Sequence, residues 1–179
     1  MALKLALLAV FVVLGASAVE NELPLNVWKA ISKGTYVLIQ RSYQKVGATC
    51  TYAKIKTKDQ STHSYTAEMG FTLNGKKMKN TYNMYAAKET GKNTRNVLSI
   101  SSKPLTDPLQ GELYFLIYRD GKGCNILFAQ NKTTRKDLEC EMWVEKNVAD
   151  NISEDCKHYY NDRCMAVVET HYSKACKIP

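Results

Sequence analysis

Hydrophobic and polar residues alternate in short segments between residues 34 and 145, and these segments are rich in Tyr, Thr, Val and Ile. Turn-forming residues separate the segments every dozen or so positions. The pattern predicts strands over residues 35–43, 49–57, 63–73, 77–87, 95–101, 112–119, 124–130 and 138–145. Eight short antiparallel strands in succession are typical of an up-and-down β-barrel, whose interior holds side chains or one small ligand.

The turns between these segments support the same interpretation. Asn74-Gly75 is the strongest hairpin signal in the chain. Residues 89–93 and 120–123 are longer turns of the same kind, while Pro104 and Pro108 bracket a loop that is incompatible with a central strand.

Two helical pieces are expected to flank the strands. Asn26 is placed to cap a single turn over residues 26–31. A longer helix is expected over residues 150–164, capped by Asn151 or Ser153, because cysteines and tyrosines recur there at helical spacing. A loop held only by disulfides is the alternative for this second segment.

The N-terminus has the order of a cleavable secretory signal. Lys4 precedes an apolar run over residues 5–15, and three small residues follow at 16–18. The run is shorter than the roughly 20 residues needed to span a bilayer, and no second run of comparable length follows. We therefore expect a signal peptide over residues 1–18, a secreted, extracellular single domain over 19–179, and no membrane span.

The six cysteines fit an oxidising compartment, where an even number implies three disulfides. The residues alone allow fifteen pairings. Two N-x-[ST] sequons, at Asn131 and Asn151, predict glycosylation in the same compartment.

The formal net charge is +8, and the lysines and arginines gather at residues 54–58, 76–79 and 132–136. Such clusters usually decorate the solvent-facing side of strands and turns. No nucleic-acid recognition motif accompanies them, so we expect no nucleic-acid partner. The positive charge also leaves open an attraction to acidic glycans or cell surfaces as a secondary property.

Three motifs carry a family resemblance. They are Asn-Val-Trp-Lys-Ala at 26–30, Cys-Asn-Ile at 124–126 and Cys-Glu-Met-Trp-Val at 140–144, followed by a cysteine-rich tail. In this order and spacing, the chain resembles the tick salivary lipocalins of the histamine-binding-protein family over essentially its whole mature length.

The resemblance implies an all-β fold, an eight-stranded antiparallel lipocalin barrel with a short N-terminal helical turn and a C-terminal helix packed outside. It also implies the disulfides Cys50–Cys176, Cys124–Cys156 and Cys140–Cys164. Family members are secreted into the bite, where they bind host mediators such as histamine, serotonin, leukotrienes or other lipids. Some branches act on complement or immune cells.

The resemblance points to Asn125, Glu141 and Trp143 as ligand-binding residues. In amine-binding members an Asp stands where Asn125 is, and an acidic residue is usual where Asn26 stands. Asn accepts a hydrogen bond from an ammonium but carries no charge, and charge-assisted bonds are roughly twice as strong as neutral ones. The absence of an acidic residue at both positions favours a hydrophobic ligand such as a lipid, eicosanoid or sterol, unless Glu68 or Glu112 completes an amine site.

Several side chains have two open interpretations. Glu141 either faces the barrel interior, where it pairs with an amine, a Lys or an Arg, or is an exposed strand residue. Trp28 and Trp143 either stack on a ligand or pack in the core. The strand aromatics, Tyr36 and Tyr114 among them, either line a pocket or fill the barrel. Arg95, Arg119 or a lysine at the mouth is a candidate partner for a lipid carboxylate.

No nucleophile motif, phosphate loop or metal-ligand spacing appears, so we expect no enzyme, no cofactor and no metal. The sequence favours a monomeric secreted protein that sequesters a host small-molecule mediator and so dampens inflammation or immunity. A different class remains open, a protein-binding module with a filled barrel whose loops contact a host immune protein or cell.

Overall fold

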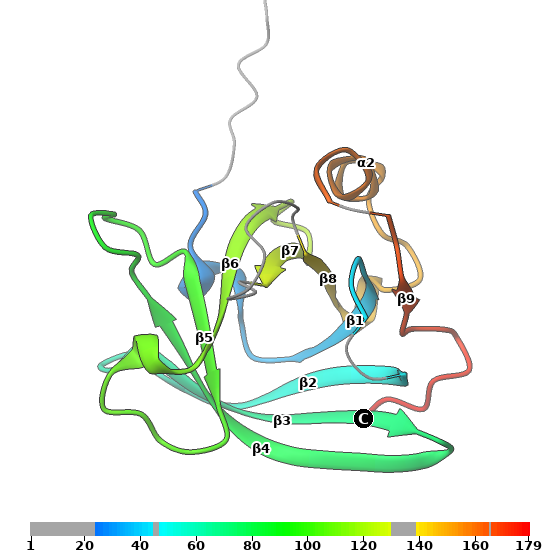
Figure 1. Cartoon of the computed structure of the whole chain (residues 1–179), viewed down its shortest axis with the longest axis horizontal. Helices are drawn as coiled ribbons and strands as arrows, with labels where there is room; N and C mark the ends of the chain where they lie inside the picture. The colour runs from blue at the N-terminus through cyan, green and yellow to red at the C-terminus, as the bar shows by residue number, and fades with distance from the viewer. Residues whose placement is uncertain (1–23, 45–46, 130–138, 165) are drawn as a thin grey trace, which may run out of the picture.

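Eight antiparallel strands close into a barrel in the computed structural model of the chain (Figure 1). The structure describes residues 24–44, 47–129, 139–164 and 166–179. The expected signal segment over residues 1–18 and the sequon at Asn131 lie outside the described residues. The all-β lipocalin barrel expected from the sequence is confirmed.

The strands follow one another around the barrel in chain order, each paired with its sequence neighbour. Their bounds are β1 (Thr35–Arg41), β2 (Ala48–Asp59), β3 (Ser64–Leu73), β4 (Lys76–Ala87), β5 (Val97–Ser101), β6 (Glu112–Arg119), β7 (Cys124–Ala129) and β8 (Cys140–Glu145). Short 3-10 turns, η1 (Pro108–Gln110) and η2 (Lys146–Val148), follow β5 and β8. The Asn74-Gly75 hairpin forms between β3 and β4, with positive φ at both residues.

The barrel closes through β1, which pairs with β8 on one side. On its other side β1 pairs with β2 only over Thr35–Val37, and beyond that point a short ninth strand, β9 (Glu169–Thr170), takes the place of β2. The backbone of His171 then donates to the Ile39 carbonyl and accepts from the Cys50 amide. The C-terminal tail is therefore part of the barrel wall, which the sequence pattern did not predict.

The helical turn α1 (Val27–Ala30) lies at the end of the barrel where β1 begins and β2 ends. Asn26 caps it, as expected, by accepting a hydrogen bond from the Lys29 amide. The ammonium of Lys58 donates to the carbonyls of Trp28 and Ile31, at 2.8 Å each, and lies 4.0 Å from the centre of the Trp28 ring. One partly buried cation thus ties the turn to β2.

The helix α2 (Glu154–Arg163) lies outside the barrel (Figure 1). It packs against β6 and β7. Ser153 is its cap, and disulfides link Cys156 to Cys124 and Cys164 to Cys140. The Tyr159 ring stacks on that of Tyr118 with 4.4 Å between centres. The expected helix is confirmed, although it begins at Glu154 rather than at residue 150, and the loop alternative is wrong.

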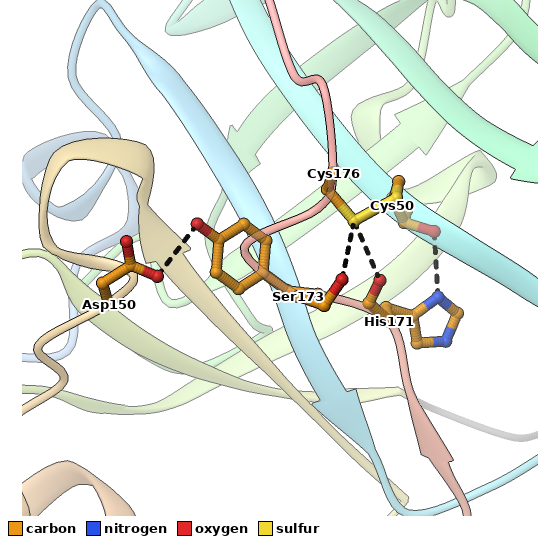
Figure 2. Close-up of a disulfide and its surroundings, with 7 residues drawn as sticks. Cys50, Asp150, His171, Ser173 and Cys176 are labelled. Atoms are coloured by element: carbon orange, nitrogen blue, oxygen red, sulfur yellow. Dashed lines mark hydrogen bonds between the residues drawn. A yellow bond between two sulfur atoms is a disulfide. The ribbon is translucent and has the colours of Figure 1, made fainter.

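The third disulfide joins Cys50 on β2 to Cys176 in the tail, across 126 residues of sequence (Figure 2). Beside it, Thr51 and the imidazole Nδ1 of His171 lie 2.9 Å apart, and Tyr172 donates to Asp150. All three disulfides have the pairing that the family resemblance implied. Two of them hold α2, and the third holds the tail against the barrel.

Candidate ligand-binding cavity

The barrel encloses a cavity of about 230 Å³. Most of its wall is apolar and comes from α1 and all the barrel strands. The apolar lining residues include Val27, Ile31, Leu38, Ala53, Ile55, Met69, Phe71, Met84, Leu98, Ile100, Leu116 and Leu127. The strand side chains therefore leave an interior space, which is evidence against the filled-barrel alternative.

Five of the six residues that the sequence singled out for ligand binding border this cavity. They are Tyr36, Tyr114, Asn125, Glu141 and Trp143. Trp28 is not among the lining residues. Its ring packs instead against Tyr65 and His63, with 4.9 Å and 5.1 Å between ring centres, and beneath the Lys58 ammonium. The structure therefore places Trp28 in the packing that holds α1.

Glu141 faces the interior and is only 4% exposed, so the exposed-strand alternative is wrong. One carboxylate oxygen accepts a hydrogen bond from the Trp143 indole at 2.7 Å. The other accepts from the Tyr43 hydroxyl and lies 4.0 Å from Nη1 of Arg41. Both oxygens thus have partners within the protein.

Arg41 is buried at the end of β1 and borders the cavity. Its guanidinium also binds Glu169 of β9, and the Glu169 carboxylate lies 3.1 Å from Nε2 of His171. Arg41, Glu141, Glu169 and His171 consequently form one buried polar network that connects the cavity to the C-terminal tail. Buried charges of this kind are stable only when they are paired and hydrogen-bonded.

The sequence favours Arg95 and Arg119 as candidate cations, whereas among the described residues the cation that borders the cavity is Arg41. Tyr36 and Leu38 face inward on β1, so simple alternation predicts that Arg41 faces outward. The ladder between β1 and β8 is irregular between Leu38 and Gln40, and this irregularity reverses the alternation. Such an irregularity leaves no clear signal in a single sequence.

A second carboxylate lies near the first. Glu112 borders the cavity at the start of β6, and the Tyr114 hydroxyl donates to its Oε1 at 2.9 Å. Glu68, the other carboxylate considered for an amine site, points to the outside of the barrel, where it pairs with Lys56 and Lys79. Of the two candidates only Glu112 is placed to contact a ligand.

Burial sets the protonation of this polar region. Desolvation, and then the nearby Glu141 carboxylate, raise the pKa of both Tyr43 and Tyr114, so the two hydroxyls remain protonated donors. Desolvation, and then the charge of Arg41, lower the pKa of His171, which therefore favours the neutral imidazole. The region offers hydroxyls, an amide and paired charges to a ligand.

Asn125 lies on β7 directly across the ladder from Trp143, and its side chain is buried at the cavity wall. Glu141 lies two positions before Trp143 on the same face of β8. Two of the three motifs that carried the family resemblance, those at 124–126 and 140–144, therefore meet at one part of the cavity. Asn125 contributes an uncharged amide to this part of the wall.

A protein-family model described as tick histamine binding protein matches residues 18–178 of the chain. No relative was found among curated protein sequences. Among solved structures, Japanin from Rhipicephalus appendiculatus bound to cholesterol is similar at a TM-score of 0.61 and 16% identity, over 83% of this chain and 98% of Japanin.

The AM182 serotonin complex is similar at a TM-score of 0.59 and 15% identity, over 85% of this chain and 93% of AM182. Lobster apocrustacyanin A1 is similar at 0.57 and 11% identity, over 85% and 82% of the respective chains. At these identities the structures share the fold alone.

Proposed function

Because the chain belongs to the tick histamine-binding protein family, we propose that it sequesters a hydrophobic small molecule of the host in its barrel. Proteins of this fold family are binding proteins, and the chain is one of them rather than an enzyme. The observation that carries the ligand class is an apolar cavity whose buried charges already pair with one another. A neutral amphipathic lipid, such as a sterol, suits this lining.

The pairing of Glu141 argues against a small amine as the preferred ligand. An incoming ammonium would have to displace Arg41, Tyr43 or Trp143 from the carboxylate. Asn125 supplies no compensating charge. A nanomolar dissociation constant corresponds to about −12 kcal/mol, and a ligand of few atoms reaches that only if nearly every polar atom is matched.

The pairing of Arg41 similarly argues against an acidic ligand that would bind through its own carboxylate. Glu141 and Glu169 already pair with the guanidinium that such a ligand would need. A neutral lipid avoids both conflicts. It gains affinity from apolar burial, at about 25 cal/mol per Å² removed from water. Its polar end would find hydrogen-bonding groups in Tyr114 and Asn125, which border the cavity.

A biogenic amine is the second candidate, and Glu112 is the observation in its favour. This carboxylate borders the cavity close enough to Tyr114 to accept its hydroxyl, and both Glu112 and Glu141 influence that tyrosine electrostatically. Cholesterol accompanies Japanin and serotonin accompanies AM182, so the fold accommodates both classes of ligand.

In the proposed role the protein is secreted and removes a host mediator by stoichiometric binding, which dampens inflammation or immunity at the feeding site. The apolar N-terminal segment and the three disulfides support an extracellular location. In the described part of the chain, no helix is long and apolar enough to cross a membrane.

Native mass spectrometry of the secreted protein, before and after solvent extraction, tests this proposal. We expect an extractable lipid bound one to one. Met69→Trp, which fills part of the cavity, should abolish lipid retention, whereas Thr49→Trp at an exposed position of β2 should preserve it. Equal retention by the two variants would show that the lipid binds outside the barrel and would overturn the proposal.

A further inference from the structure

The outer surface of β2, β3 and β4 has a feature that the cavity does not use. These three strands lie side by side along one side of the barrel (Figure 1). Ala53, Ile55 and Met69 border the cavity, as do Asn80 and Tyr82 of β4. The residues between them point outward because side chains alternate along a strand.

Four lysines gather on that outer surface, and we call them the lysine face: Lys54, Lys56, Lys77 and Lys79. Lys56 and Lys79 flank the Glu68 carboxylate from neighbouring strands, with Nζ to Oε2 distances of 3.4 Å and 3.9 Å. Their side chains remain 43% and 70% exposed. Both ammonium groups are thus positioned yet accessible to an anionic partner.

Positive charge dominates this surface. Among the described outward positions of β2, β3 and β4, two carboxylates are set against the four lysines: Glu68 between them, and Asp59 at the end of β2, where its carboxylate accepts from the backbone and hydroxyl of Ser61 in the turn. The Tyr52 hydroxyl donates to Oε1 of Glu68 at 2.9 Å, which fixes this carboxylate at the centre. The excess charge lies on hydrogen-bonded strands rather than on a loop, so the backbone positions of the lysines keep a constant spacing.

The surface between the lysines is flat and polar. The Tyr52 ring lies across Gly70, where an added Cβ would come within 2.4 Å of it. Gly70 is paired with Lys79, and Thr72 with Lys77, across the β3–β4 ladder. Met78, the exposed apolar residue of β4, alternates with Lys77 and Lys79 and so points to the other side of the strand.

We propose that the lysine face binds a sulfated polysaccharide. Sulfates along a linear chain match ammonium groups fixed on two strands, and sugar hydroxyls match the threonines and the Glu68 carboxylate between them. An anionic membrane would gain from apolar side chains inserted among the cations, and this face offers none among its described residues. A single-stranded nucleic acid would need aromatic rings free to stack on bases, whereas Tyr52 is held against Gly70.

Such binding would retain the protein on extracellular glycans while the barrel remains open to its small molecule. The inference does not depend on the identity of that molecule or on the cavity. It concerns a second site on the opposite side of the same strands.

Affinity for heparin, measured by surface plasmon resonance at about 0.15 M salt, tests the proposal. The variant with Lys54, Lys56, Lys77 and Lys79 all changed to Gln should bind at least about tenfold more weakly, because ionic contacts dominate polyanion binding. The matched control changes the exposed Lys88, Lys103, Lys122 and Lys157 to Gln, which removes the same charge elsewhere. The control should stay within about twofold of the original protein.

Circular dichroism and small-molecule binding should be the same for both variants. Desulfated heparin should lose most of the affinity, which would support recognition of the sulfates. Equal weakening by the control would show that net charge alone drives the binding, and would overturn the proposal. Stronger binding to phosphatidylserine vesicles or to an oligothymidine than to heparin would also overturn it.

Discussion

At the scale of single residues, Arg41 is central to the proposed ligand class. It is the only arginine or lysine among the described residues that border the cavity, and it lies buried between Glu141 and Glu169. A buried ion pair adds little net stability compared with apolar packing, but loss of one partner leaves the other charge uncompensated.

We therefore expect Arg41→Met to lower the free energy of unfolding by about 3–5 kcal/mol, because the buried Glu141 and the partly buried Glu169 would lose their cation. Urea denaturation measures this loss. Lys157→Met, which removes an exposed partner of Glu154, is the matched control and should cost less than about 1 kcal/mol. Equal costs for the two variants would contradict the buried network.

Asn125→Asp tests the assignment of ligand class. The change adds a carboxylate beside Trp143 and close to Glu141. We expect serotonin affinity to rise at least about tenfold, since an additional charge-assisted bond becomes available. Calorimetric titration with serotonin measures it, and Asn83→Asp on the outside of β4 is the control. An unchanged dissociation constant for serotonin would show that position 125 does not contact the ligand.

His171 gives stability a pH dependence. Burial, followed by the charge of Arg41, lowers its pKa below the ordinary value near 6.5, while the Glu169 hydrogen bond partly opposes this. The unfolded chain therefore binds a proton at a higher pH than the folded chain does. The stabilising effect is complete above about pH 6.5 and declines as the pH falls below that value.

The free energy of unfolding at pH 7.5 and at pH 5.5 checks this expectation, since carboxyl groups ordinarily titrate below that window. His171→Gln should reduce the difference between the two values. Desolvation also lowers the pKa of His63, so both proteins carry His63→Gln. A difference that persists in full without His171 would assign the pH dependence to another group.

At the scale of elements, α1 is held in part by one side chain from β2, that of Lys58. Four residues form too short a helix to be stable alone. Lys58 holds both Trp28 and Ile31 through their carbonyls. Tertiary contacts thus fix the turn. Among them is the contact of the Trp28 ring with the Lys58 ammonium, which keeps Trp28 out of the cavity.

Lys58→Met should cost about 2–3 kcal/mol of stability, because it removes two charged hydrogen bonds and a cation–π contact. Hydrogen exchange of the Ala30 and Ile31 amides, which bond to Asn26 and Val27, should accelerate at least about tenfold. Lys54→Met, on the outer face of the same strand, is the control. Protection equal to that of the control would show that α1 is held by other contacts.

The elements also show how far the sequence is informative. Alternation and the Asn74-Gly75 turn were sufficient to place the eight barrel strands, because period-two patterns report directly on a half-buried strand. The ninth strand was missed, since Glu169–Thr170 is short and owes its conformation to β1 and to the Cys50–Cys176 disulfide. The same tail supplies His171 to the cavity wall.

The sequence predicted only those residues of the site that local motifs identify. Glu141 and Asn125 were predicted because each stands at a known position of a motif that carries the family resemblance. Arg41 depends on an irregular ladder, and its partner Glu169 depends on the return of the tail. Both features arise only when distant segments fold together.

At the scale of the whole molecule, the two faces of the same strands differ in chemical character, and we propose a different role for each. The inner face encloses an apolar cavity with a compensated polar region, and the outer face of β2–β4 carries the lysines. Three disulfides fix α2 and the tail on the barrel without entering the cavity. Ligand capture and surface retention are therefore expected to be separable by mutation.

The most direct test of the central claim is calorimetric titration of the delipidated protein with cholesterol, histamine and serotonin in parallel. We expect cholesterol to bind one to one with a dissociation constant at or below about 1 μM, which corresponds to about −8 kcal/mol, and both amines to bind at least about a hundredfold more weakly. Tight binding of an amine without binding of the sterol would contradict the claim that the paired Arg41 and Glu141 select a neutral hydrophobic ligand.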